Sequence, residues 1–329
     1  MSREATDSHR IFVGIGEVLF DVFEDGREAL GGAPLNVAVH AHQLAAPLGL
    51  GEGVVVSAVG NDAHGRLLLS AVRSRAMSTR YIATEAEHPT GRVSVFMRDG
   101  EPGYQIEFPA AWDFIVPGDS LDALASQCHA VCFGSLAQRS PVSRNTIRQF
   151  LENAPQAVRL YDVNLRQNTK SGERAYSREI VETSCRLATI IKANQPELMT
   201  ICELLGIETS PDTTGNGIRR RLEALLARFP ARAVVLTRGG EGTLLFTRDR
   251  EISVDVTPIP PAQLHPVGAG DASSAGILVG LALGWEEAQA VDLANRMGAW
   301  VAAEPPATPT LPDSIIDYVR NALRAQSSV

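Results

Sequence analysis

The sequence predicts a doubly wound α/β fold, a mostly parallel sheet flanked by helices, with a small β-sheet lid. Short apolar runs rich in β-branched residues alternate with helical patterns, which implies a parallel sheet covered by helices on both faces. Two segments break this alternation and have the pattern of hairpins. A chain of 329 residues can bury a large core. We expect one domain over residues 1–329, with ligands bound at the carboxyl ends of the strands.

The expected strands of the main sheet are, in chain order, residues 11–16, 53–60, 129–135, 158–164, 188–194 and 233–240. Helical patterns lie between them, including 34–45, 63–76 and 219–229. A further helix is expected within residues 265–285, HPVGAGDASSAGILVGLALGW. Its apolar part is far shorter than the roughly 20 residues that cross a bilayer, so we expect no membrane association.

The lid is expected from residues 17–32, EVLFDVFEDGREALGG, and 91–108, GRVSVFMRDGEPGYQIEF. In each segment β-type residues are split by a turn signal, and neither pattern is followed by a helix. We interpret them as hairpins that together cover the edge of the main sheet and exclude water from a reaction. Two independent surface hairpins are the alternative. An apolar lid face would need a cover, which predicts a homodimer.

Composition excludes several classes of partner. The net charge is −8, which gives no electrostatic reason to bind nucleic acid, although a small anion held by backbone N–H groups remains compatible. The polar opening MSREATDSHR has no apolar segment of a secretory signal, and four cysteines without metal-type spacing indicate reduced thiols in a cytoplasmic protein. His40 and His42 are two residues apart on a helix, so they do not share a face and are expected to be structural.

Two nucleotide-binding motifs can be excluded. GxxxxGK[ST] is absent, and GIGEVL, residues 14–19, has Leu19 where a dinucleotide fingerprint needs its third glycine or alanine. A hydride-transfer enzyme is therefore disfavoured. RGGEGT, residues 238–243, lies between two strand patterns and is compatible with a tight turn.

The helix that begins near GAGD, residues 268–271, is a candidate anion site. The first N–H groups of a helix have no intrahelical partners, and glycine allows the backbone to approach a ligand closely. Asp271 could cap this helix or react with the ligand. The stretch by itself leaves both possibilities open.

Six motifs together resemble the ribokinase-like (PfkB) family of carbohydrate kinases, and fructokinase-type members most of all. They are GGAPLNVA (31–38), VGNDAHG (59–65), DVNLR (162–166), NQPE (194–197), LTRGGEG (236–242) and GAGD (268–271). They occur in the family's order over about residues 11–325. The resemblance implies a kinase that uses ATP and Mg²⁺ to phosphorylate a small sugar.

The resemblance also implies roles for individual residues. Asp271 would be the general base, and the backbone of Gly268, Ala269 and Gly270 would form an anion hole for the phosphoryl group. Hydroxyl groups of the sugar would be bound by Asp21, Gly32 and Asn36, with further sugar or phosphate contacts from Arg92, Asn164 and Arg166.

On the nucleotide side, the resemblance assigns cofactor binding to Asn194, Thr237, Gly239 and Gly242. Glu197 would organise Mg²⁺ through water, and the alternative is an ordinary glutamate in the first turn of a helix. His265 and Pro266 stand where the family has Asp-Thr of a monovalent-cation site, so potassium activation is not expected. Ser273 replaces a usual aromatic residue, and Pro306 a usual glycine of the adenine loop.

Fructose is the first choice of substrate, phosphorylated on a primary hydroxyl, because GGAPLN, DVNLR and PAAWD (109–113) look most like fructokinase-type members. The alternative substrate is 2-keto-3-deoxygluconate, whose carboxylate Arg166 or Arg92 could bind. A non-catalytic sugar or nucleotide sensor on the same fold is the alternative of a different class.

Overall fold

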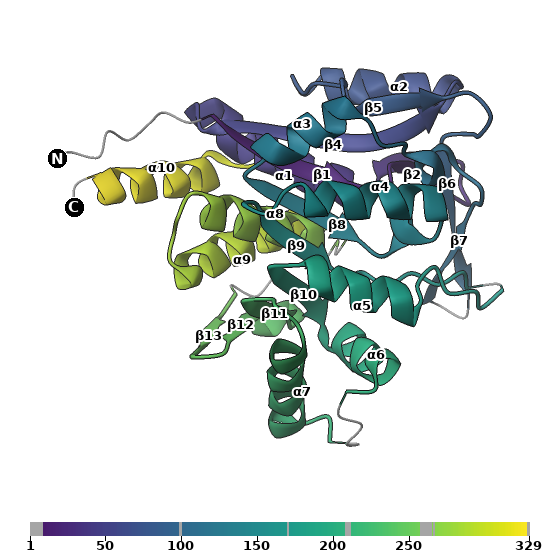
Figure 1. The fold of residues 1–329 in the computed structure, drawn as a ribbon. Helices are drawn as coiled ribbons and strands as arrows, with labels where there is room; N and C mark the ends of the chain where they lie inside the picture. Colours follow the sequence, from purple (N-terminus) through teal and green to yellow (C-terminus); the bar gives the residue numbers. More distant parts are fainter. Residues whose placement is uncertain are drawn as a thin grey trace.

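The main sheet has nine strands in the order β13-β12-β11-β10-β9-β8-β1-β4-β5 (Figure 1). The computed structural model describes residues 9–327 except 99–100, 170, 208–211, 257–264 and 266. The strands are β1 (Arg10–Ile15), β4 (Gly51–Gly60), β5 (Ile82–Glu85), β8 (Ala130–Gly134), β9 (Val158–Asp162), β10 (Ile190–Asn194), β11 (Ala233–Thr237), β12 (Thr243–Thr247) and β13 (Glu251–Val254). Only the pairs β11–β12 and β12–β13 are antiparallel. The predicted mostly parallel sheet is confirmed.

A separate four-stranded sheet has the order β3-β2-β6-β7. It consists of β2 (Leu19–Phe23), β3 (Glu28–Gly31), β6 (Gly91–Arg98) and β7 (Glu101–Ile106). The two antiparallel hairpins, β2–β3 and β6–β7, are joined through a parallel β2–β6 pair, so the expected small sheet is confirmed. The expectation that no helix follows the first hairpin is wrong. Helix α1 begins one residue after β3, and Pro34 in its first turn suits a helix start.

Ten helices longer than one turn are described. They are α1 (Ala33–Ala45), α2 (Ala63–Arg73), α3 (Asp119–Gln127), α4 (Pro141–Glu152), α5 (Arg178–Leu187), α6 (Gln195–Leu205), α7 (Gly215–Arg228), α8 (Ala269–Ala282), α9 (Glu287–Ala303) and α10 (Asp313–Ser327). Residues of α3 to α7 pack on one face of the sheet, and residues of α1, α8, α9 and α10 pack on the other. Among the described helices, none is long and apolar enough to cross a membrane.

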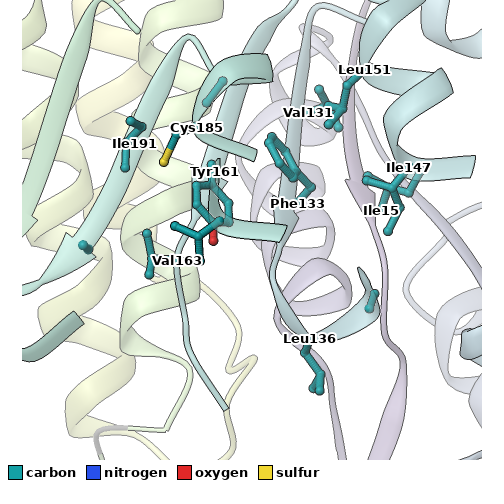
Figure 2. Packing of buried hydrophobic residues seen from close by; sticks show 14 of the residues in the cluster. Ile15, Val131, Phe133, Leu136, Ile147, Leu151, Tyr161, Val163, Cys185 and Ile191 are labelled. Carbon is teal, nitrogen blue, oxygen red and sulfur yellow. The ribbon is translucent and has the colours of Figure 1, made fainter. Parts of the chain in front are cut away.

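Alternate strand residues supply the two cores. In β8, Val131 and Phe133 belong to the core under α3 to α7, whereas Ala130 and Cys132 face α1 and α8. Figure 2 shows the first core, with Phe133 beside Tyr161 between neighbouring strands. All four cysteines are buried and free, as the sequence predicts.

Helix α1 lies unusually close to the strands beneath it. A Cβ atom on Gly14 would lie 1.9 Å from the carbonyl oxygen of Pro34, and one on Gly53 would lie 2.0 Å from that of Ala38. The close packing of α1 therefore explains Gly14, the first glycine of GIGEVL, without a role in dinucleotide binding. This packing positions the start of α1 beside the carboxyl end of β1.

The histidines of α1 are structural, as expected. The Nε2 atom of His40 lies 3.1 Å from the carbonyl oxygen of Ala307, and Nδ1 of His42 accepts a hydrogen bond from the Gly53 N–H. Burial lowers the pKa of His40 to about 4, so its ring is neutral at pH 7. The contact to Ala307 joins α1 to the segment between α9 and α10.

Strand β1 is the point where the chain changes direction across the sheet. The next parallel strand along the chain, β4, lies on one side of β1, and β8 lies on its other side. Ligands in open α/β sheets bind at the carboxyl ends of strands beside such a point. Glu17 lies just after β1, and Asp162, Asn194 and Thr237 end β9, β10 and β11 at the same carboxyl edge of the sheet.

Candidate active site

Asp271 is the third residue of α8 and does not cap it. The N-cap residue is Gly268, whose φ of 85° is left-handed and which has no side chain to bond the helix start. The first N–H groups of α8 are therefore free of side-chain capping. Ala269 and Gly270 follow at the start of the helix, next to the carboxyl group of Asp271.

The carboxyl group of Asp271 is held by α1. Asn36 Nδ2 donates a hydrogen bond of 2.8 Å to Asp271 Oδ2. Burial, together with the negative charge of Asp162, raises the pKa of Asp271 to about 6, although Asn36, Lys192 and Arg166 oppose the rise. The group is thus ionised at neutral pH and is a stronger base than an ordinary aspartate.

The charge of Arg166 acts on several carboxyl groups of the candidate site. Burial raises the pKa of four carboxyl groups, and the charge of Arg166 opposes the rise in each: Glu17, Asp21, Glu197 and Asp271. The Arg166 side chain is exposed, and its described hydrogen bond is to the Leu165 carbonyl oxygen. The structure therefore brings Asp21, Arg166 and Asp271 into one charged site.

Two further sugar-site candidates have positive φ angles. Asn164 follows β9 with a φ of 36°, which asparagine tolerates better than most residues. Gly32 has a φ of 112°, and a Cβ atom there would lie 2.4 Å from the carbonyl oxygen of Glu17. Gly32 thus lets the segment after β1 approach the start of α1.

Arg92 is placed apart from this group. It is paired in register with Phe20 of the parallel neighbour β2, so it shares a face of the small sheet with Phe20, whereas Asp21 lies on the opposite face. On its own face, Arg92 lies 3.7 Å from Glu28, which also contacts His64. The structure does not bring Arg92 to Asp21, and we leave it out of the sugar site.

The predicted nucleotide residues lie together at two neighbouring strand ends. Asn194 of β10 and Thr237 of β11 are register partners. Thr237 leads into a turn in which Gly239 and Gly242 have φ values of 56° and 82°. A Cβ atom on Gly242 would lie 2.2 Å from the Val254 carbonyl oxygen, so this position needs glycine for packing as well.

Glu197 takes part in a capping box at the start of α6. Asn194 Oδ1 accepts the Glu197 N–H, and Glu197 Oε2 accepts the Asn194 N–H. The other oxygen, Oε1, accepts the Leu165 N–H at 3.2 Å. Each carboxylate oxygen keeps a lone pair after one such bond, so Glu197 can still accept a hydrogen bond from a water molecule held by Mg²⁺.

Four residues depart from the family pattern, and the structure describes three of them. His265 is exposed, and its N–H donates to the Ala302 carbonyl oxygen, whereas Pro266 lies outside the described residues. Ser273 is buried and its hydroxyl has no described partner. Pro306 is exposed. The prediction about potassium therefore remains a prediction.

Sequence reasoning missed a buried ion pair beneath the start of α8. Lys192 Nζ donates 2.9 Å to Asp162 Oδ2, and Ser274 Oγ donates 2.8 Å to the same atom. The side chains are almost fully buried. Burial by itself lowers the pKa of Lys192, but Asp162 raises it above its ordinary value, so Lys192 is charged. A lysine inside the apolar run ATIIKAN was the available signal.

Glu17, within GIGEVL, was also missed. It is 4% exposed, burial raises its pKa to about 7, and its Oε2 atom has no hydrogen-bond partner. A glutamate just beyond the end of a buried strand was the available signal. A cavity of about 520 Å³ lies elsewhere, between α7 and the β12–β13 hairpin, and contains none of the predicted site residues.

Known proteins resemble this chain over most of its length. A model of the family described as pfkB family carbohydrate kinase matches residues 20–314. The chain is 29% identical to a fructokinase of Klebsiella pneumoniae over 82% of this chain and 83% of that protein. It is 24% identical to an ATP-dependent 6-phosphofructokinase of Thermoanaerobacterium thermosaccharolyticum over 93% of this chain and 92% of that protein.

A solved structure has the same fold. The fructokinase of Xylella fastidiosa with bound ATP superposes with a TM-score of 0.77 and 19% identity, over 95% of this chain and 98% of that chain. The resemblance inferred from the six motifs is confirmed, and so is the predicted fold class.

Proposed function

The chain belongs to the pfkB family of carbohydrate kinases, and on that premise we propose that it transfers the γ-phosphoryl group of ATP to a primary hydroxyl of fructose. The observation that carries the proposal is Asp271, a half-buried carboxylate of raised pKa that lies beside the uncapped start of α8. It is a base next to an anion site, which is the arrangement that phosphoryl transfer to an alcohol needs.

In the proposed reaction, Asp271 takes the proton of the sugar hydroxyl while the hydroxyl oxygen attacks the γ-phosphorus. The new O–P bond forms as the bond from the γ-phosphorus to the β-phosphate bridging oxygen breaks, and ADP leaves. Asn36 holds the base in place through the bond to Oδ2, and the α8 N–H groups stabilise the charge on the phosphoryl oxygens. One such donor is typically worth about 3–4 kcal/mol.

The nucleotide would lie over the ends of β10 and β11. Asn194 and Thr237 supply polar groups there, and Gly239 and Gly242 shape the turn that follows. Mg²⁺ would neutralise charge on the transferred phosphate, held by Glu197 through water. Glu197 also orients the loop with Asn164 and Arg166, because its Oε1 accepts the Leu165 N–H.

The charge balance favours an uncharged sugar. Glu17, Asp21 and Asp271 supply three carboxyl groups, and the positive charge of Arg166 acts on each of them. A sugar acid or a phosphorylated sugar would add negative charge to a site that already has an excess of acids. 2-Keto-3-deoxygluconate is the second choice, with its carboxylate on Arg166.

The experiment is a panel of acceptors assayed by ADP release with MgATP. It contains fructose, ribose, glucose, 2-keto-3-deoxygluconate, fructose 6-phosphate and nucleosides, each with and without potassium. We expect turnover of fructose without a potassium requirement. Turnover of an anionic sugar in preference to fructose would refute the substrate assignment.

The sensor alternative is tested with Asp271→Asn. We expect kcat to fall by about 10²–10⁴, the usual worth of a general base, with little change in sugar affinity measured by calorimetry. Asp25→Asn, in the exposed β2–β3 turn, is the matched control and should keep full activity. Unchanged turnover in Asp271→Asn would remove the assignment of the base.

We further propose a homodimer that forms through the small sheet. Val22 is apolar and only half-buried on the face of that sheet opposite Asp21. A second copy would cover that face. A monomeric mass by light scattering at micromolar concentration would refute this proposal.

A further inference from the structure

Glu17 is a buried acid whose carboxyl group has hydrogen-bond partners for only part of its capacity. It lies two residues after the end of β1 and is 4% exposed. Backbone N–H groups, its own and that of Ala33 at the start of α1, stabilise the carboxylate. Its Oε2 atom, however, has no hydrogen-bond partner. A buried polar atom is almost always paired in a native structure, so an unpaired one in a ligand site needs an explanation.

The Glu17 carboxyl group lies near the sugar half of the candidate site. The charges of Arg166 and Asp271 both act on the Glu17 carboxyl, and Gly32 brings its backbone against the start of α1. A second orphan is close by, because Asn36 uses Nδ2 for Asp271 while its Oδ1 has no partner. Both orphans are hydrogen-bond acceptors, and the groups they lack are donors.

We propose that Glu17 determines specificity by accepting, at Oε2, a hydrogen bond from a sugar hydroxyl other than the one that is phosphorylated. The inference rests on the proposed sugar-kinase function and deepens it. A polyol supplies several O–H donors to these acceptors without adding negative charge beside the carboxyl groups of the site. The substrate class is therefore an uncharged polyol with a free hydroxyl beside Glu17.

The role of Glu17 differs from that of Asp271. Asp271 acts on the reacting hydroxyl, so its loss lowers kcat. Glu17 would contribute the same hydrogen bond in the ground state and the transition state, so its loss raises KM. Glutamine is a suitable replacement because its amide oxygen can keep the bond from Ala33. Its NH₂ group then occupies the free position, where it cannot accept a hydroxyl proton.

The test compares wild type, Glu17→Gln and a matched control, Glu152→Gln, at the exposed end of α4. KM and kcat are measured with the sugar that the wild type phosphorylates, and its affinity without ATP is measured by calorimetry. We expect Glu17→Gln to raise KM and the dissociation constant about 10-fold or more, with kcat within about 3-fold, as for a hydrogen bond to a charged group. The control should match wild type.

Sugar analogues that each lack one hydroxyl give a readout that does not depend on a variant. With wild type, one analogue should bind about 10-fold more weakly than the parent sugar, and the penalty should disappear in Glu17→Gln. If no single deletion costs more than about 2-fold, the proposal is wrong even if Glu17→Gln does not fold. An unchanged KM in folded Glu17→Gln also overturns it.

The pH dependence supplies a further readout. As pH falls below about 7, Glu17 takes up a proton, so KM should rise in wild type and stay level in Glu17→Gln. A wild type that binds a sugar through Glu17 without phosphorylating it would support this inference and refute the kinase reaction. A wild type that phosphorylates a sugar with a KM indifferent to Glu17 would do the reverse.

Discussion

Replacing Lys192 with methionine tests whether Lys192 and Asp162 form a buried ion pair under α8. Lys192 and Asp162 are 4% and 5% exposed, and their charged atoms are 2.9 Å apart. The same carboxylate also accepts the Ser274 hydroxyl. Lys192→Met keeps the length and the apolar stem of the side chain, so the main loss is the positive charge.

The expected cost follows from the group left behind. Without Lys192, the Asp162 carboxylate keeps only the Ser274 hydroxyl as its described partner. Removing one member of a buried pair typically costs about 3–5 kcal/mol. At roughly 2.1 cal/mol/K per residue, unfolding 329 residues has an entropy near 0.7 kcal/mol/K, so the midpoint should fall by about 4–7 °C.

The assay is thermal and urea unfolding at pH 7.5, followed by circular dichroism. Arg320→Met is the control, because Arg320 forms an exposed pair with Asp317 and should leave the midpoint unchanged. The double variant Lys192→Met with Asp162→Leu removes both charges and should recover most of the loss. A single variant as stable as wild type would refute the description of Lys192 as a buried, paired cation.

Three further predictions concern the carboxyl groups of the site. The kcat of wild type should fall as pH drops through about 6, because Asp271 must be ionised to act as a base. Asn36→Ala removes a hydrogen bond that lowers the pKa of Asp271, so the fall in kcat should occur at higher pH in this variant. Identical pH–rate profiles for the two proteins would contradict this. Glu17→Gln should be up to about 3 kcal/mol more stable than wild type in urea at pH 8, since a folded-state pKa of about 7 costs stability above the ordinary value of 4.5, and the advantage should shrink as pH falls from 7 to 4.5. Glu197→Ala breaks the capping box and the bond to Leu165, so it should lower the unfolding free energy by about 1 kcal/mol and raise the Mg²⁺ concentration needed for half-maximal activity; equal Mg²⁺ curves would exclude the metal role.

The alternating strands and helices around the main sheet could be predicted because each has a pattern of apolar residues within its own sequence. Apolar runs such as residues 53–60 and 233–240 became β4 and β11, and the helix starting at GAGD became α8. The partners of these elements could not be predicted in the same way. The parallel β2–β6 pair joins segments about seventy residues apart, and that register places Arg92 on the face opposite Asp21.

The missed residues are charged groups whose role depends on distant partners. Lys192 looks like an interruption of a strand until Asp162, thirty residues earlier, is placed beside it. Glu17 looks like part of a failed dinucleotide motif until burial and an unpaired oxygen are visible. Chemistry of this kind is set by three-dimensional neighbours, and hydrophobic periodicity carries no information about them.

The contact between α1 and the sheet has a consequence for any library of variants selected only for soluble protein. At positions 14 and 53, every side chain would collide with the backbone of α1, so such a selection should return glycine alone. Gly118 has open space and an extended φ of 173°, and should accept many residues. Intolerance to substitution at Gly14 would thus reflect the short distance between α1 and β1. A survey that takes every intolerant position to be catalytic would assign Gly14 the wrong role.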